Sequence, residues 1–195
     1  MPDTYPVHLD VVSPERVARW RPLVNWLLVI PVHLWLFLLL IATEVVVVLS
    51  WFAIVVAGRQ PESFGAFTTG VIRYTWRTTA FLYALEERYP GFTVPTGFTD
   101  PGDFPAVVNV VPELKRNRLT VFFRAFMLIP HYVVLYFLGI VSFVVLVLAW
   151  FAVLFTGRWP EGFRRFYVGY SRWFTRYLAY AFLVVDAYPP FSFDP

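Results

Sequence analysis

The stretch WFAIVVAGRQPE at residues 51–62 returns 99 positions later as WFAVLFTGRWPE at residues 150–161. Working outward from these stretches, residues 5–92 align with residues 104–191 without a gap, and 29 of the 88 aligned positions are identical. An internal repeat of this kind sets the architecture before any single motif does. Two copies are too few for a solenoid. The sequence therefore predicts a pseudo-symmetric pair of units: a first repeat at 1–92, a linker at 93–103 and a second repeat at 104–195.

The composition is typical of a membrane protein. Hydrophobic residues make up 58% of the chain and charged residues 15%, against about 45–50% and about 25% in soluble domains. Residues 32–57 and 131–156 are apolar runs, each long enough to cross a bilayer as a tilted helix, and tryptophans lie near their ends, as they do at membrane interfaces. We therefore expect an integral membrane protein. The absence of cysteine fits the bacterial inner membrane.

Each repeat is expected to begin with a strand and a helix in the membrane interface. Apolar and polar residues alternate at 5–12, which predicts a short strand there and in the equivalent segment 104–111. The two strands can pair across the pseudo-symmetry axis. A basic, interfacial helix follows, with a start signal at Ser13 in the first repeat. Pro31 and Pro130 then mark a kink before the spanning helix.

The rest of each repeat is expected to be a transmembrane hairpin. Its first helix ends at Gly58 or Gly157, where glycine is the usual C-terminal residue, and its second helix covers 64–86 or 163–185. The resulting fold class is an all-α integral membrane protein with four spans in two hairpins. Both turns then face one side of the membrane, and the termini and the linker face the other. Basic residues near span ends favour cytoplasmic termini by the positive-inside rule.

The second helix carries charge that complicates a crossing. Arg73 and Arg77 lie at helical spacing, and two arginines cost about 5–7 kcal/mol on the insertion scale, more than the apolar residues of this helix return. The helix can lie in the interface instead, or it can cross with its arginines facing protein. Glu44 is 14 residues before Gly58 and Arg73 is 12 residues after Pro61, so a hairpin places them at similar depth. This match favours crossing with an ion pair.

The residues assembled so far resemble a bacterial membrane family, the domain of unknown function DUF4389. The likeness covers nearly the whole chain, once per repeat, and the first copy departs from it at Ala57 and Tyr74. The resemblance implies a protein with several spans and supplies no activity, so no functional residue carries over from it. It is carried by Tyr-Pro-Val at 5–7, Ile-Pro before each span, Trp-Phe-Ala and Thr-Gly-Arg-x-Pro at 150–160, Arg-Trp-x-x-Arg at 172–176 and Tyr-Pro-Pro-Phe at 188–191.

Two sets of residues are candidates for function. Glu44 is either a proton or cation carrier within the membrane or half of a structural ion pair. The arginines of the second helices either bind anionic lipid headgroups, which guanidinium groups match bidentately, or extend to the interface as anchors. In the second repeat Phe143 replaces Glu44, so the arginines there need Glu44 itself, a lipid phosphate or water. The candidate headgroup sites are Arg73, Arg77, Arg165, Arg172 and Arg176.

Other chemistry finds little support in the sequence. His33 and His131 stand near the starts of the apolar runs but are not equivalent in the repeat, so we interpret them as interfacial residues in preference to haem or metal ligands. Nucleotide-binding glycine loops and the common hydrolase and metalloprotease motifs are missing. The acids Glu87 and Asp186 align at the ends of the second helices, where capping explains them. We expect no cofactor, no metal site and no nucleic-acid partner.

These observations lead to two hypotheses of different classes. The first is a non-enzymatic, multi-pass protein of the bacterial inner membrane that binds lipids, anionic phospholipid among them, or serves as a scaffold or accessory subunit of a membrane assembly. Its partners would be lipids and a membrane protein or a second copy of the chain. The second is a small transporter or channel subunit with its site between the repeats. A membrane enzyme is less well supported, because no nucleophile or metal site is recognisable.

Overall fold

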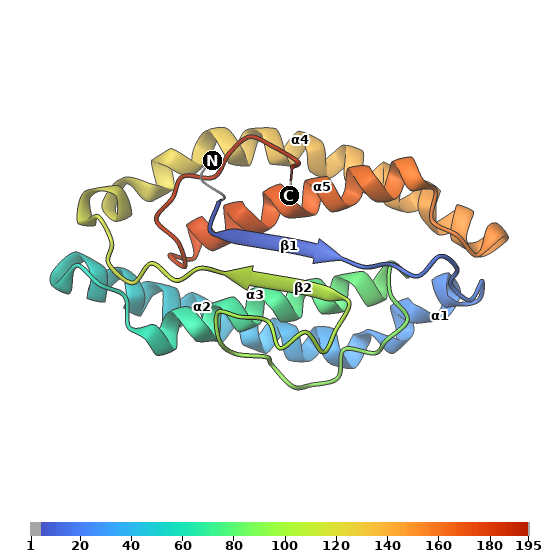
Figure 1. Ribbon diagram of the computed structural model, residues 1–195, viewed down its shortest axis with the longest axis horizontal. Coiled ribbons are helices and arrows are strands. Elements are labelled where there is room, and N and C mark those ends of the chain that lie inside the picture. Colours follow the sequence, from blue (N-terminus) through green and yellow to red (C-terminus); the bar gives the residue numbers. More distant parts are fainter. Residues whose placement is uncertain (1–4, 195) are drawn as a thin grey trace.

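The computed structural model describes residues 5–194. Two antiparallel strands and two pairs of helices form an elongated molecule in which the repeats run in opposite directions (Figure 1). The elements of the described chain are β1 (Val7–Val11), α1 (Arg21–Leu28), α2 (Ile30–Ala57), α3 (Glu62–Leu82), β2 (Ala106–Val110), α4 (Arg118–Thr156) and α5 (Glu161–Ala181).

The elements form three layers. The first is the β1–β2 sheet, in which Val7 is opposite Val110 and Val11 is opposite Ala106. The second layer is α3 and α5, on which the strands pack. The third is α2 and α4, which pack on α3 and α5 respectively and touch each other. The largest buried cluster fills the space between the sheet and the inner helices, with residues such as Leu9, Val108 and Ile72.

The two repeats exchange their strands. β1 belongs to the first repeat but packs on α5 of the second, and β2 of the second repeat packs on α3 of the first. Equivalent side chains hold both contacts. Nε of Arg73 donates to the carbonyl of Val108 at 3.1 Å, and Nε of Arg172 donates to the carbonyl of Leu9, also at 3.1 Å. Neither repeat is therefore complete without the strand of the other.

A second exchange joins the repeats at their ends. The N–H of Val17 donates to the carbonyl of Gly157 at 2.8 Å, and the N–H of Arg116 donates to the carbonyl of Gly58 at 3.0 Å. Both glycines end a long helix with positive φ, 71° at Gly58 and 70° at Gly157, a conformation that glycine adopts at little cost. The turn that follows each long helix thus lies beside the segment that precedes the first helix of the other repeat.

This arrangement corrects the expected topology. The turns at Gly58 and Gly157 lie at opposite ends of the molecule, because α2 and α4 run antiparallel (Figure 1). The expected arrangement of two parallel hairpins, with both turns at one end of the molecule, is therefore wrong. The count of basic residues that favoured cytoplasmic termini depended on that arrangement and no longer supports it.

The local elements match the sequence unevenly. The strands and their pairing are confirmed. The interfacial helix is separate only in the first repeat, where it begins at Arg21 and not at the start signal near Ser13, and where Val29 alone divides it from α2. In the second repeat α4 continues through Pro130 without a break. Proline removes one helical hydrogen bond, and the packing of a 39-residue helix compensates for that loss.

Two helices within the described chain are long and apolar enough to cross a membrane, α2 and α4. Only 22% of the residues in each apolar window are buried, so these are not the core helices of a soluble domain. The inner helices α3 and α5 do not meet the same criterion, and neither exposes a large hydrophobic side chain. The mostly helical, duplicated architecture agrees with the sequence. Four spans are not confirmed.

Candidate functional site

The arginines of α3 form a closed ion-pair cluster with the linker. Arg73 is fully buried, and its Nε lies 2.7 Å from Oδ2 of Asp100. Nη2 of Arg77 lies 3.2 Å from Asp100 and 2.7 Å from Asp103. Guanidinium groups buried in this way need paired acids and hydrogen bonds to offset desolvation. The expected pair of Arg73 with Glu44 is therefore wrong, because the linker supplies the acid.

Hydrogen bonds and close packing of the linker position Asp100 beside α3. Oδ2 of Asp100 accepts the N–H of Val108 at 3.1 Å, and Oδ1 of Asn109 accepts the N–H of Asp100 at 2.7 Å. Glycine at position 70 lets the linker approach α3 closely, since a Cβ atom there would lie 2.9 Å from Cα of Thr96. The segment between the repeats is thus a packed part of the fold.

Glu44 has a different environment from the one expected. It lies on α2, in the outer layer, and is exposed. Within residues 5–194 it forms no ion pair and no side-chain hydrogen bond. An unpaired acid on a largely apolar helix surface is a liability in lipid, and nothing among the described contacts makes it structural.

The arginines of α5 are also engaged. Arg172 bonds to the carbonyl of Leu9 and lies 3.3 Å from Oδ1 of Asp10. Arg176 is buried and donates to the carbonyls of Ser192 and Asp194. Of the five predicted headgroup sites, only Arg165 is largely exposed, at 80% of its side chain, and its Nη2 lies 3.7 Å from Oε1 of Glu161. The structure does not bring the five together as a binding site.

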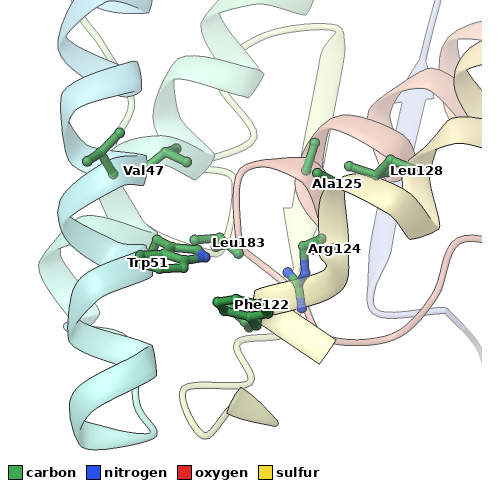
Figure 2. Close-up of a pocket in the computed structure, with 10 residues that line it drawn as sticks. Val47, Trp51, Phe122, Arg124, Ala125, Leu128 and Leu183 are labelled. Carbon is green, nitrogen blue, oxygen red and sulfur yellow. The ribbon is translucent and has the colours of Figure 1, made fainter. Parts of the chain in front are cut away.

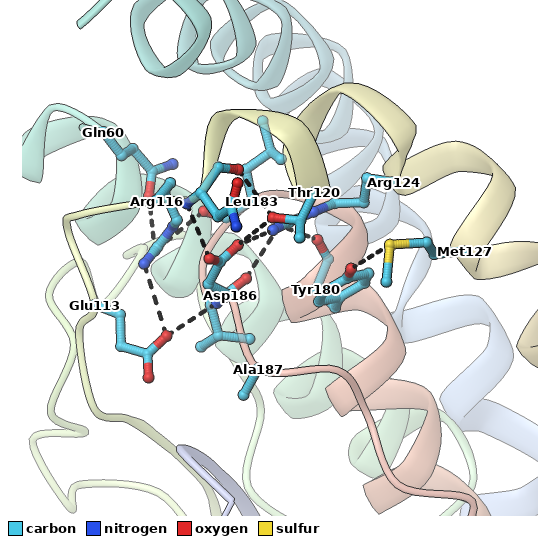
Figure 3. Close-up of polar contacts among 12 residues, drawn as sticks. Gln60, Glu113, Arg116, Thr120, Arg124, Met127, Tyr180, Leu183, Asp186 and Ala187 are labelled. Atoms are coloured by element: carbon cyan, nitrogen blue, oxygen red, sulfur yellow. Dashed lines mark hydrogen bonds and ion pairs between the residues drawn. The ribbon is translucent and has the colours of Figure 1, made fainter. Parts of the chain in front are cut away.

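A third cluster, which sequence reasoning did not identify, occupies the start of the second repeat (Figure 3). Nη2 of Arg116 donates to the carbonyl of Val184 at 2.5 Å and to Oε1 of Gln60 at 3.4 Å. Nη1 of Arg124 donates to the carbonyl of Tyr180 at 2.9 Å, and its Nη2 pairs with Asp186. Burial lowers the pKa of Arg116 to about 10, so this cation is held at the cost of desolvation.

The repeat itself contained a signal for this third cluster. Arg116 aligns with Val17 and Arg124 with Asn25, which are apolar or neutral residues. Nδ2 of Asn25 donates to the carbonyl of Phe81, the equivalent of Tyr180. A charged residue at a position that is buried and uncharged in the other copy indicates a buried cation. Both arginines belong to the basic stretch of the second repeat that was expected to lie in the membrane interface.

Contrary to the expectation from the sequence, the aligned acids Glu87 and Asp186 do not cap the second helices but accept backbone N–H groups of the segments that precede the first helices. Oε1 of Glu87 accepts the N–H of Ala18 at 2.9 Å, and Oδ2 of Asp186 accepts the N–H of Asn117 at 3.1 Å. Ala18 and Asn117 are themselves equivalent residues that precede the first helix of each repeat. Both acids therefore fix the same joint in the fold.

The histidines are not a pair of ligands. His131 is completely buried, accepts a hydrogen bond at Nδ1 from Nε1 of Trp173 at 3.0 Å and stacks on Phe191. Its prediction as an interfacial residue is wrong, because it faces α5 and the C-terminal segment. His33 is half-buried at the edge of an internal cavity. Within residues 5–194 no three His, Asp or Glu side chains are grouped to hold a metal ion.

Besides an apolar cavity of about 430 Å³ between α4 and α5, two others could hold apolar groups of a ligand. One, of about 360 Å³, lies between α2 and α4 and is lined by side chains including Val47, Trp51 and Phe122, with Arg124 at its edge (Figure 2). The guanidinium of Arg124 is already bonded to protein. The other, of about 330 Å³, lies between the repeats and is lined largely by aromatic rings such as Trp76 and Tyr170. Neither contains the charged group that would fix a headgroup.

The outer layer has the surface best suited to a ligand. Along α1, α2 and α4 the structure exposes 32 large hydrophobic side chains, from Leu23 (51% exposed) on α1 to Phe155 (69% exposed) at the end of α4. Soluble proteins rarely expose an apolar patch of this extent. We call this surface the apolar face. Exposed cations border it at both ends of the molecule: Arg16, Arg19, Arg158 and Arg165 at one end, and Arg59, Lys115 and Arg118 at the other.

Comparison with known proteins supports the repeat. Residues 19–93 and 118–192 each match a family described as a domain of unknown function, DUF4389. Both matches begin after the strands, so the family unit is the helical part of each repeat. Neither the curated proteins nor the solved structures contain a significant match.

Proposed function

The chain belongs to the DUF4389 family in both of its repeats, and we propose that it is a non-enzymatic membrane protein that binds anionic lipid and supports a membrane assembly. The apolar face carries this proposal. Lipid acyl chains are the one abundant partner that covers so large an apolar surface, and the bordering cations suit phospholipid headgroups. A bacterial inner membrane remains the proposed location.

The part of the molecule that meets the headgroups differs from the one the sequence suggested. The arginines of α3 and α5 are consumed by internal contacts, as with Arg73 and Asp100. The cations at the two ends are exposed, not buried in this way, and lie at the border of the apolar face. Among them Arg165 makes an exposed pair with Glu161. We therefore assign anionic-lipid binding to the ends of the molecule. Arg165 is the only residue that belongs both to this assignment and to the five candidates named from the sequence.

Vesicle flotation tests this assignment. Protein diluted from mild detergent is mixed with vesicles of phosphatidylcholine, with or without phosphatidylglycerol. Each cation near an anionic surface contributes about 1 kcal/mol, so a variant with Arg59, Lys115 and Arg118 changed to Gln should lose roughly a hundredfold in its preference for the anionic vesicles. The preference of the wild-type protein should fall as salt rises.

A matched variant separates surface from interior arginines. Arg172→Gln removes one cation from the inner layer, where Arg172 binds Leu9 and Asp10, and should leave the lipid preference intact. A preference that is lost with Arg172 and kept without the three end cations would contradict the assignment. Equal binding of the wild-type protein to both kinds of vesicle would contradict anionic-lipid binding itself.

A small transporter or channel subunit is the second candidate. Two features favour it: the repeats are antiparallel, as in inverted-repeat transporters, and a cavity of about 330 Å³ lies between them. In this case Glu44 is the ionisable group of the pathway. Ion or proton flux in proteoliposomes that disappears with Glu44→Gln, at unchanged vesicle binding, would favour transport over the lipid-binding role.

A further inference from the structure

We propose that the protein lies flat in a single leaflet, with α1, α2 and α4 parallel to the membrane and with the sheet and the linker in water. This inference deepens the proposed function and rests on it, because lipid must be the partner of the apolar face. It replaces the expected crossing of the bilayer by an in-plane insertion of the outer layer.

The length of the apolar face is the first argument. On α4 its exposed side chains extend from Leu119 (66% exposed) to Phe155 (69% exposed), which is about 54 Å of helix at 1.5 Å per residue. The hydrocarbon core is about 30 Å thick. Even at a tilt of 40°, the upper end of the usual range, about 41 Å of this surface would extend along the membrane normal. A crossing helix would therefore leave apolar side chains in water.

The opposite face is the second argument. The linker crosses the centre of α3, where the backbone of Thr96, an exposed residue, lies beside Gly70. The side chain of Asp103 is 54% exposed and pairs with Arg77, nearer the C-terminal end of α3. If the helices crossed the bilayer, the irregular backbone beside Gly70 would face acyl chains near mid-depth, and the carboxylate of Asp103 would lie only about 10 Å closer to one membrane surface. Exposed irregular backbone does not occur in lipid, and a charge there is costly. In the flat orientation both are hydrated.

The order of the layers makes the two arguments consistent. The strands and the linker cover α3 and α5 on one side, and α2 and α4 lie on the other. Figure 2 looks onto the groove between α2 and α4, with α5 and the strands beyond it. The lipid-compatible and the water-requiring surfaces are thus opposite faces of one slab. A crossing protein would instead have an apolar belt around it and polar surface at its two ends.

The distribution of cations fits the same orientation. Exposed cations lie at both ends of the molecule, for example Arg59 beside one turn and Arg158 beside the other. A crossing orientation would put them on opposite sides of the membrane, without the charge asymmetry that usually orients a span. In the flat orientation both ends reach the headgroups of the same leaflet.

Cysteine labelling distinguishes the two orientations, and the chain has no native cysteine to interfere. Single variants Arg59→Cys, Arg158→Cys and Thr99→Cys place a thiol at each turn and in the linker, all at exposed positions. A membrane-impermeant maleimide is applied to sealed spheroplasts and to inverted vesicles from cells that produce the full chain. Phe137→Cys, on the apolar face, is the control that should react only after detergent is added.

The flat orientation requires that all three thiols react in the same preparation and stay protected in the other. Labelling of Arg59→Cys and Arg158→Cys from opposite sides would overturn it, as would a linker thiol that is protected in both preparations. Glu62→Cys and Glu161→Cys, at the same two turns, serve if the first pair impairs folding. Protein that fails to float with membranes would instead refute the proposed function.

Discussion

The two repeats contain the same pair of arginines but stabilise them differently. In the first repeat Arg73 and Arg77 are buried against Asp100 and Asp103 of the linker. In the second, Arg172 and Arg176 are satisfied mainly by backbone carbonyls, and Asp10, the acid that pairs with Arg172, is 68% exposed in its side chain.

This difference shows what the arginines do. Their shared contact is with the exchanged strand, through the carbonyls of Val108 and Leu9. The acids differ between the repeats, but the arginine-to-strand bond does not. In each repeat this arginine is thus the clamp that holds the strand of the other repeat. The groups that neutralise its charge differ between the two repeats.

The largest expected effect comes from removing the buried acid. Asp100→Asn leaves two buried guanidinium groups without their shared charge, and breaking a buried pair costs about 3–5 kcal/mol of unfolding free energy. The matched change Asp10→Asn affects an exposed pair and should cost less than about 1 kcal/mol. Denaturant unfolding in detergent, followed by circular dichroism, measures both. Equal losses of unfolding free energy in the two variants would show that both arginines depend on their paired acid to the same extent.

The next effect concerns equivalent positions on the outer helices. Glu44 and Phe143 align, and both are exposed. Removing the charge at one position and adding a charge at the other should shift the affinity for vesicles in opposite directions. Glu44→Gln should bind phosphatidylcholine vesicles about tenfold more tightly, and Phe143→Glu about tenfold less tightly. Each change corresponds to about 1.4 kcal/mol of binding free energy. Flotation over a range of lipid concentrations gives the affinities. An unchanged affinity for Phe143→Glu would remove this residue from the apolar face.

A smaller effect is expected from the glycines at which the chain crosses the inner helices. A Cβ atom at position 70 would meet the linker backbone at 2.9 Å, and one at position 169 would meet Cβ of Phe193 at 2.8 Å. Overpacking costs about 1–3 kcal/mol, and the gain in helix propensity returns about 1 kcal/mol. Gly70→Ala should lose the most, because the displaced linker carries Asp100. A larger loss for Gly169→Ala in thermal unfolding would reverse this ranking.

The smallest effect is a pH dependence that arises from Asp103 of the linker. The hydrogen bond from Arg77 holds the pKa of Asp103 below its ordinary value. An acid whose pKa is lower in the folded state contributes stability above its unfolded pKa of about 3.9, and that contribution is lost as the pH falls through the folded pKa. The melting temperature of Asp103→Asn should therefore fall less steeply below about pH 4 than that of the wild type. Parallel curves would exclude this linkage.

Much of the fold could be predicted from the sequence because the elements produce periodic patterns of residue types. The 99-residue repeat, the strands and the glycine-terminated long helices all follow from local residue types. The pairing of Glu44 with Arg73 did not hold, because it assumed that the nearest charge in a hairpin is the partner. Asp100 lies in a linker of unremarkable composition, and only its packing over α3 brings it to the arginine.

What the sequence determined by itself is the duplication, the class of each long helix and the apolar character of α2 and α4. These depend on residue spacing within one element. The tertiary structure alone decided that the repeats are antiparallel, that they exchange strands and that the arginines are buried clamps. Such features depend on contacts between residues far apart in the chain, where several partners of the same chemistry compete and the geometry of packing selects one.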